Sequence, residues 1–195
     1  MRLLDYMLNL VNSKLRLVKI SRKNALLVII IPLWLVLALI GLLFASKSIE
    51  KPFDPTGALY YASNKPDFDS QVNSMLYGAL HVPLNNVVVH ITSHSDCLCQ
   101  LTASRHIKSV KDAVEYIGKR NETVYIENIK DLSNMLTSTP AIAVFDEQGN
   151  LSYLGPYSTG IGCLSSNGTV EPYLDTKSTW GAIVPLESTG CYCYV

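Results

Sequence analysis

The chain has 195 residues with sixteen basic and sixteen acidic side chains, so its formal net charge is zero. The charges are unevenly distributed: six basic residues and one acidic residue precede Ala25, a local charge of +5, whereas ten basic and fifteen acidic residues follow Ala45, a local charge of −5. The larger, acidic part has no basic patch, which argues against nucleic acid as a partner.

Between these two parts, residues 25–45 (ALLVIIIPLWLVLALIGLLFA) contain no charged side chain. A helix needs roughly 20 such residues to cross a bilayer, and a membrane helix tolerates a proline such as Pro32 when neighbouring groups satisfy the freed carbonyl. A cleavable signal peptide would have an apolar core of about 7–15 residues and an A-x-A-like cleavage site. The triplet Leu43-Phe44-Ala45 lacks that site, so the segment predicts an uncleaved transmembrane signal anchor.

The basic residues also predict the orientation of the chain. Six of them precede the span, and only Lys47, Lys51 and Lys65 follow it closely. The positive-inside rule then keeps residues 1–24 in the cytoplasm and exports the rest of the chain. In a bacterium this describes a single-pass protein of the cytoplasmic (inner) membrane with a periplasmic domain, where disulfides are permitted.

Beyond the span, residues 46–66 contain three prolines and one glycine, and they predict a linker before an exported domain at 67–195. Alternating apolar patterns then predict an α/β fold with a mixed sheet and helices on both faces. The stripe Ile107, Val110, Val114 and Ile117 is the expected buried face of one of the helices. In chain order we expect a helix from about 67, a strand at 86–93, a helix at 100–119, a strand at 122–129, a short helix at 130–136, a hairpin of strands 141–147 and 151–157, and a last helix at 169–180.

Two cysteines, Cys97 and Cys99, lie where the strand at 86–93 meets the following helix. Unpaired N–H groups at a helix N-terminus stabilise a thiolate, which makes a cysteine there more reactive. Protonated His94 would assist, whereas the negative charge of Asp96 would raise the thiol pKa. These residue types predict a redox site whose reactivity His94 and Asp96 modulate.

The order of elements, the junction cysteines and the Thr139-Pro140 dipeptide before the strand at 141–147 resemble the thioredoxin-like superfamily over residues 86–180. With the Gly-Cys-Tyr-Cys tail, the chain also resembles a bacterial group of membrane-anchored thioredoxin-like proteins that has no established activity. The resemblance implies redox chemistry at Cys97 and Cys99, and a cis Pro140 that contacts the substrate together with Thr139. Thioredoxins have two residues between their cysteines; here there is one, and two helical residues so spaced point about 200° apart.

The tail contains a second C-x-C pair, Cys191 and Cys193, which alternation places on one face of an extended segment. Cys163 follows a glycine-rich turn. These three are the candidate resolving or structural cysteines, and the sequence does not choose among the disulfide pairings. Of the histidines, His90 is expected to be a hydrogen-bonded core residue, whereas His81 and His106 are expected on the surface.

Three functions remain open for the cysteines. The first, which we expect, is a thiol–disulfide oxidoreductase or isomerase without a cofactor, with Cys97 as the attacking thiolate. Its partners would be exported thiol-containing proteins, with a membrane electron donor or acceptor in addition. The second is a Cu(I) or Zn(II) site made by Cys97, Cys99, Cys191 and Cys193, since these metals favour sulfur ligands; C-x-C spacing argues against zinc. The third is a non-catalytic binding module stapled by disulfides.

Overall fold

The computed structural model describes residues 22–94, 97–160, 168–175 and 181–195. It divides into two compact units, Met1–Lys47 and Ser48–Val195, and we describe each by itself.

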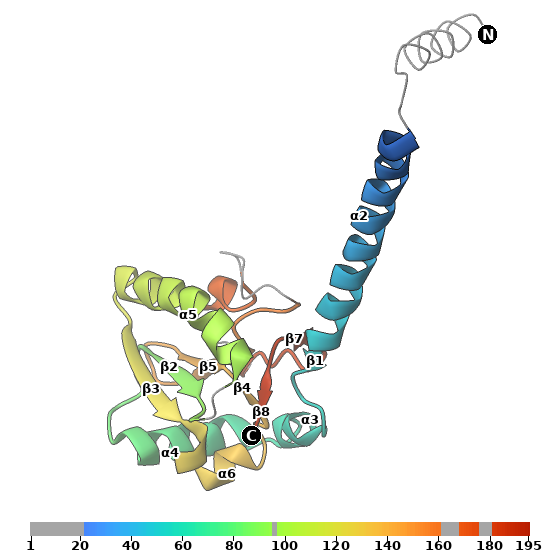
Figure 1. The fold of residues 1–195 in the computed structure, drawn as a ribbon. Helices are drawn as coiled ribbons and strands as arrows, with labels where there is room; N and C mark the ends of the chain where they lie inside the picture. The colour runs from blue at the N-terminus through green and yellow to red at the C-terminus, as the bar shows by residue number, and fades with distance from the viewer. Residues whose placement is uncertain (1–21, 95–96, 161–167, 176–180) are drawn as a thin grey trace, which may run out of the picture. The chain divides into compact units, whose positions relative to one another are not determined.

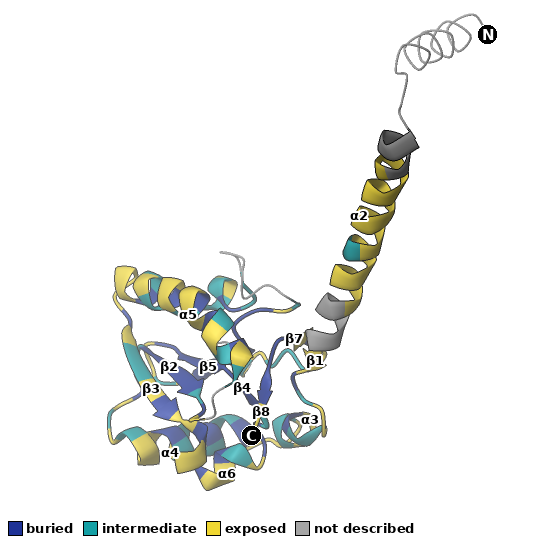
Figure 2. Ribbon diagram, viewed as in Figure 1, coloured by how far each residue is buried: buried dark blue, intermediate teal, exposed yellow. Residues whose placement is uncertain are grey.

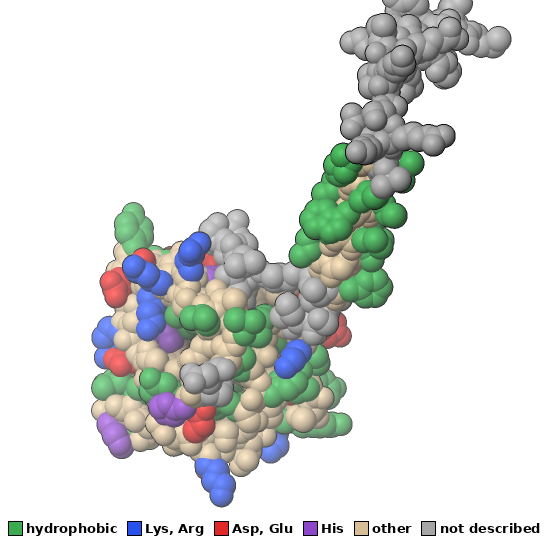
Figure 3. All heavy atoms as spheres, viewed as in Figure 1, with side chains coloured by type: hydrophobic (Ala, Val, Ile, Leu, Met, Phe, Trp, Pro, Cys, Tyr) green, Lys and Arg blue, Asp and Glu red, His purple; other side chains and the backbone are tan. Residues whose placement is uncertain are grey.

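The first unit contains the apolar helix α2 (Arg22–Ile49), with Pro32 inside it (Figure 1). Its segment Leu27–Phe44 is long and apolar enough to cross a membrane. Large apolar side chains are exposed along this helix, including Trp34 at 65% and Phe44 at 73% (Figure 3). The apolar segment Leu27–Phe44, none of which is buried, matches the expected membrane span.

The second unit is built on a four-stranded mixed sheet with the strand order β3-β2-β5-β6. Strands β2 and β3 are parallel and are joined by helix α5, whereas β5 pairs antiparallel with both β2 and β6. The bounds are Val87–Thr92 for β2, Leu98–Tyr116 for α5, Arg120–Tyr125 for β3, Ala141–Phe145 for β5 and Leu151–Pro156 for β6. These elements confirm the predicted α/β class, the mixed sheet and the hairpin.

Both faces of this sheet are covered, which explains the continuous apolar run in β2. Val87, Val89 and Ile91 face a core shared with α4 (Phe68–Leu80) and α6 (Lys130–Ser133). Val88 faces the opposite core, which Val110 and Val114 of α5 complete. Figure 1 shows α5 on one side of the sheet and α4 with α6 on the other, and Figure 2 shows the buried strands between them.

Two small sheets lie beside the main one, and each joins segments far apart in the sequence. Strand β1 (Lys51–Pro52) pairs with β7 (Thr189–Gly190). Strand β4 (Ser138–Thr139) pairs with β8 (Cys193–Tyr194). The tail is therefore part of the folded unit along its whole length.

The expected linker at 46–66 is wrong for most of its length. It supplies β1 and the helix α3 (Ala58–Ser63), and the side chains of Phe53 and Leu59 are buried in the main core. Pro55, Gly57 and Pro66 lie in turns around these short elements, whereas Pro52 lies in β1 itself. An Asp54 carboxylate that accepts the backbone N–H groups of Leu59 and Tyr60 holds one of those turns in place.

Two expectations about helices also need correction. The buried face of α5 consists of residues 99, 103, 106, 110 and 114, so Ile107 is only partly buried and Ile117 is 37% exposed. The last helix, expected at 169–180, is described only as the 3₁₀ turn η3 (Glu171–Tyr173), and residues 176–180 lie outside the described residues. A second 3₁₀ turn, η1 (Ile126–Asn128), follows β3.

Candidate functional site

Cys97 occupies the junction between β2 and α5. It is the residue before the first turn of α5, and its backbone is extended (φ −103°, ψ 131°). Its carbonyl accepts the backbone N–H groups of Gln100 and Leu101 at 3.1 and 3.3 Å, which starts the helix. The Cys97 side chain makes no capping hydrogen bond to this end of the helix. The helix N-terminus therefore directs partial positive charge toward the first residues, Cys97 and Cys99.

The tail brings the second pair of cysteines to this junction. Strand β7 holds the tail against β1, and β8 holds it against β4, so Cys191 and Cys193 project from an extended segment. Tyr192, between them, points the other way: its ring packs on Phe53 at 5.1 Å and its hydroxyl donates to the Ser158 carbonyl at 2.9 Å. The prediction that both tail cysteines share one face is confirmed.

The four cysteines form two disulfides between the two C-x-C pairs. Cys97 bonds Cys193 and Cys99 bonds Cys191, with Cα–Cα distances of 6.0 and 5.2 Å. The two bonds connect the start of α5 to the tail in antiparallel order, so that the first cysteine of each C-x-C pair bonds the second cysteine of the other pair. No bond joins Cys97 to Cys99, so the helical divergence of residues two apart does not have to be overcome.

The two disulfides differ in their access to solvent. Cys99, Cys191 and Cys193 are buried, at 8%, 7% and 4% exposed, whereas Cys97 is only half-buried. Attack on a disulfide requires an approach to one sulfur atom. Among these four residues, Cys97 offers that approach.

Polar contacts hold the chain on both sides of the junction. The Gln100 side chain donates to the Ser93 carbonyl at 3.1 Å and accepts the Ser93 N–H at 3.3 Å. Glu127 accepts hydrogen bonds from the Ser93 hydroxyl and from the His94 N–H. Burial opposes ionisation of Glu127, but these hydrogen bonds and the charge of His94 lower its carboxyl pKa below the usual value.

Of the two residues predicted to modulate the thiol pKa, His94 lies within the described residues and Asp96 does not. The ring of His94 is exposed and stacks on Tyr125, with centroids 3.7 Å apart and planes 11° apart. Its described contacts are thus with Tyr125 and Glu127. Asp96 lies outside the described residues.

Thr139 and Pro140 lie beside the tail. Their peptide bond is cis, and Thr139 is the partner of Cys193 in the β4–β8 pairing. The hydroxyls of Thr137, Ser138 and Thr139 are buried and lack a hydrogen-bond partner within the described part of the chain. Of these three residues, Thr139 is the direct partner of Cys193.

The four cysteines that were considered as metal ligands do not form a metal site in this disulfide-bonded structure. Within the described ranges, no group of three or more His, Cys, Asp or Glu side chains is arranged to hold a metal ion. Sulfur ligates metals as thiolate, and here all four sulfurs are committed to disulfides. Cys163 lies outside the described residues.

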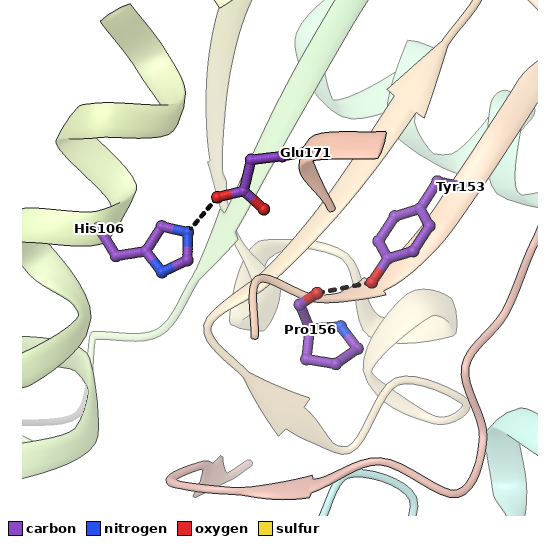
Figure 4. Close-up of polar contacts among 4 residues, drawn as sticks. All are labelled: His106, Tyr153, Pro156 and Glu171. Atoms are coloured by element: carbon purple, nitrogen blue, oxygen red, sulfur yellow. Dashed lines mark hydrogen bonds and ion pairs between the residues drawn. The ribbon is translucent and has the colours of Figure 1, made fainter. Parts of the chain in front are cut away.

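Two histidines are buried: His90 lies in β2 and His106 lies in α5. His90 bonds Tyr157 Oη and Asn121 Oδ1, which confirms it as a hydrogen-bonded core residue. His106, expected on the surface, is 3% exposed and pairs with Glu171 at 2.7 Å (Figure 4). The signal for His106 was in the sequence: it lies at helical spacing between Ala103 and Val110, on the buried stripe. His81 is exposed, as expected.

Comparison with known proteins gives one family match. Residues 66–195 match the model of a family described as "Domain of unknown function (DUF6436)". No curated protein and no solved structure matches the chain. The matched region includes all four disulfide-bonded cysteines.

Proposed function

Because the chain belongs to the DUF6436 family, a domain of unknown function, we propose its function from the cysteine cluster: it is a membrane-tethered thiol–disulfide exchange protein that acts on exported proteins. The reactive bond is Cys97–Cys193. The bond Cys99–Cys191 serves as a structural bond that keeps the tail at the start of α5.

The observation that carries this proposal is the asymmetry of the Cys97–Cys193 bond. Cys97 is half-buried at the N-terminus of α5, and Cys193 is buried. A partner thiolate therefore approaches Cys97, while the helix N-terminus stabilises the thiolate that Cys97 becomes after reduction. Accessible, thiolate-stabilised sulfurs are typical of exchange sites, whereas buried ones are typical of structural disulfides.

The chemistry is a pair of exchanges. A partner thiolate attacks Cys97 Sγ, a new partner–Cys97 bond forms, and the Cys97–Cys193 bond breaks. Its electron pair goes to Cys193 Sγ, which takes a proton from water. A second partner thiol then attacks the partner's own sulfur in the mixed bond, so the partner leaves with a disulfide and Cys97 remains as thiolate. In the reverse direction, the dithiol form reduces a partner disulfide. When the partner is oxidised instead, a membrane-bound disulfide or quinone would accept the electrons and restore the Cys97–Cys193 bond.

The resemblance to the thioredoxin-like superfamily supports the same proposal. The resemblance assigns redox cysteines to the junction of a central strand and the next helix, and Cys97 follows β2, the strand between β3 and β5. It assigns a substrate-contacting role to Thr139 and Pro140, and Thr139 lies opposite Cys193. Thioredoxins have two residues between their cysteines, whereas Cys97 and Cys99 have one. Here Cys97 pairs with Cys193 of the tail and not with Cys99.

The location follows from the anchor and the charges. The span at Leu27–Phe44 would tether the protein, and the basic residues before it would keep the N-terminus in the cytoplasm. The domain would then act in the periplasm, where tethering raises its effective concentration for partners at the membrane.

The test is exchange with a reduced dithiol peptide, using the full chain in detergent. Differential alkylation with peptide mapping should find that Cys97 and Cys193 become thiols as the peptide is oxidised, while Cys99 and Cys191 stay bonded. Cys97→Ser should abolish peptide oxidation, and the matched double variant Cys99→Ser/Cys191→Ser should retain it.

Two other results would replace the proposal. If Cys97 and Cys193 resist both reduction and alkylation in the folded chain, the bonds only staple a binding module. If the reduced chain binds stoichiometric Cu(I) or Zn(II) and loses it on Cys191→Ser, the cluster is a metal site. Metal analysis of the reduced sample separates this last outcome from exchange.

A further inference from the structure

We infer that the segment Cys193–Val195 is an internal substitute for a partner polypeptide: it occupies the edge of β4 beside Cys97 and leaves that edge when the Cys97–Cys193 bond opens. The inference rests on the proposed exchange function and adds the form of the partner, an extended cysteine-containing strand. It also adds a device by which the chain protects its own reactive edge.

The pairing of β8 with β4 is that of one strand added to an edge. Ser138 lies opposite Tyr194 and Thr139 opposite Cys193, in antiparallel register. The Val195 N–H continues the ladder by donating to the Thr137 carbonyl at 3.1 Å. A strand edge binds through its backbone and therefore accepts extended segments of many sequences.

The same segment carries the sulfur bonded to Cys97. Cys193 thus makes two kinds of contact at once: backbone pairing with Thr139 and a covalent bond to the reactive cysteine. A partner in a mixed disulfide with Cys97 would place its own cysteine where Cys193 now lies. Only one of the two strands can occupy the β4 edge, so exchange of sulfurs requires exchange of strands.

Residues 193–195 are held less firmly than the residues before them. Tyr192 is buried in the main core, and β7 is held by β1 and by the Gly160 N–H, which donates to the Thr189 carbonyl at 2.6 Å. By contrast, Tyr194 and Val195 are 43% and 45% exposed. Apart from the ladder, the described contacts of Tyr194 are a 3.2 Å bond from its hydroxyl to the Pro52 carbonyl and the Lys51 ammonium over its ring.

Hydroxyl groups in and next to β4, the strand that pairs with the segment, also lack hydrogen-bond partners in the described part of the chain. The hydroxyls of Thr137, Ser138 and Thr139 are buried without a hydrogen-bond partner in the described part of the chain. Burying a hydroxyl without a partner is unfavourable. Because Thr139 lies directly opposite Cys193, departure of the segment would give the Thr139 hydroxyl access to water or to polar groups of a partner, which favours displacement once the covalent bond is open.

The surroundings of Cys97 suit a partner with apolar side chains next to its cysteine. Leu98 and Leu101, on the first turns of α5, are 66% and 70% exposed. With Tyr194 they provide apolar area near the reactive bond. An extended segment of an unfolded exported protein, which exposes both its backbone and its apolar side chains, matches this chemistry.

The test uses chains that keep the membrane helix, in detergent, and all of them carry Cys163→Ser. A single free thiol, Cys97, then remains in each variant. One variant carries Cys193→Ser and keeps the segment; the other ends at Tyr192 and lacks it. Each reacts with a small dithiobis(nitrobenzoate) reagent and with a peptide of residues 190–195. In the peptide, Cys191 is replaced by serine and the remaining cysteine is activated by the same thionitrobenzoate group. Release of thionitrobenzoate gives both rates.

Removal of the segment should accelerate reaction with the peptide by about tenfold or more, because the peptide can pair with the open edge. The small reagent needs no edge, so its rate should change by no more than about twofold. N-methylation of the last peptide amide, equivalent to the Val195 N–H, should abolish the acceleration.

A second variant keeps the full length of the segment and removes one backbone hydrogen-bond donor. Val195→Pro in the Cys193→Ser chain removes the N–H that donates to Thr137 and should accelerate the peptide reaction, whereas the matched Val195→Ala should not. Equal acceleration of both reagents, or an undiminished rate with the N-methylated peptide, would overturn the strand exchange alone. A Cys97 that reacts with neither reagent in any variant would overturn the exchange function and this inference together.

Discussion

Cys97 and Cys193 are 96 residues apart in the sequence and are joined by a disulfide. The second bond, Cys99–Cys191, spans 92 residues and lies directly beside the first. Both bonds therefore close almost the same loop, from the start of α5 to the tail. They differ in access, since Cys97 is half-buried and the other three cysteines are buried.

The loop closed by Cys99–Cys191 lies within the loop closed by Cys97–Cys193. We therefore predict that the two bonds are redundant for stability. In the chain-entropy view, one bond that closes a loop of 100 residues contributes about 4.7 kcal/mol, and a second bond across an already closed loop adds much less. Replacing either cysteine pair by alanine should lower the free energy of unfolding by less than about 2 kcal/mol, and replacing both pairs by about 4–5 kcal/mol. Urea unfolding in a Cys163→Ser background measures these values, and fully reduced protein is the control for the quadruple variant. Additive losses from the two pairs would contradict the redundancy.

His90 predicts a loss of stability in mild acid. Its Nε2 bonds the Asn121 Oδ1 at 2.7 Å and its Nδ1 bonds the Tyr157 hydroxyl. Burial, opposed by the Asn121 hydrogen bond and reinforced by the charge of Lys111, lowers its pKa from 6.5 to about 4. Unfolded His90 thus binds a proton below about pH 6.5, whereas folded His90 binds one only below about pH 4.

The free energy of unfolding should therefore fall by up to about 3 kcal/mol through this residue as the pH decreases from about 6.5 to about 4. Denaturant unfolding at several pH values should show a shallower fall for His90→Gln than for the unmodified chain. The exposed His81 provides the control, since His81→Gln should leave the pH profile unchanged. Parallel profiles for His90→Gln and the unmodified chain would show that His90 does not carry this effect.

The His106–Glu171 pair predicts a local stability cost. It ties α5 to η3 through a 2.7 Å contact, and His106 is buried (Figure 4). Glu171→Ala leaves the His106 Nε2 without its partner and should cost about 1–3 kcal/mol of unfolding free energy. The exposed acid Asp112 on the same helix is the control, and Asp112→Ala should change stability by no more than about 0.5 kcal/mol. The double variant His106→Leu/Glu171→Leu should recover most of the loss, because no unpaired buried group remains; a cost for it as large as that of Glu171→Ala would argue against this account.

The apolar helix α2 predicts integral membrane association. Leu35 and Leu39 lie near the middle of the span, where each arginine costs about 2.5–3.5 kcal/mol of insertion free energy. The pair Leu35→Arg/Leu39→Arg should move the chain from the carbonate-resistant membrane fraction to the soluble fraction. The matched pair Leu35→Phe/Leu39→Phe should remain in the membrane. Retention of the arginine variant in the membrane would show that another part of the chain anchors it.

Local sequence patterns determined most of the secondary structure of this protein. The uncharged run at 25–45 predicted α2, and the apolar patterns at 86–93 and at 141–157 predicted β2 and the β5–β6 hairpin, because each depends on neighbouring residues and on burial along one element. The junction of β2 with α5 also followed from local pattern, and with it the position of Cys97 and Cys99. The phase of the buried stripe of α5 was predicted wrongly, because His106 is polar although it has helical spacing to Ala103 and Val110, and its partner Glu171 is 65 residues away.

The tertiary structure alone decided what the cysteines do with one another. Two C-x-C pairs in one chain are compatible with several disulfide pairings and with a shared metal site, because none of these choices depends on residues adjacent in sequence. The choice follows from two strand pairings: β7 on β1 and β8 on β4 place Cys191 and Cys193 against the first turn of α5. Burial then separates Cys97 from its three neighbours, and burial depends on packing from every side rather than on the sequence around one residue.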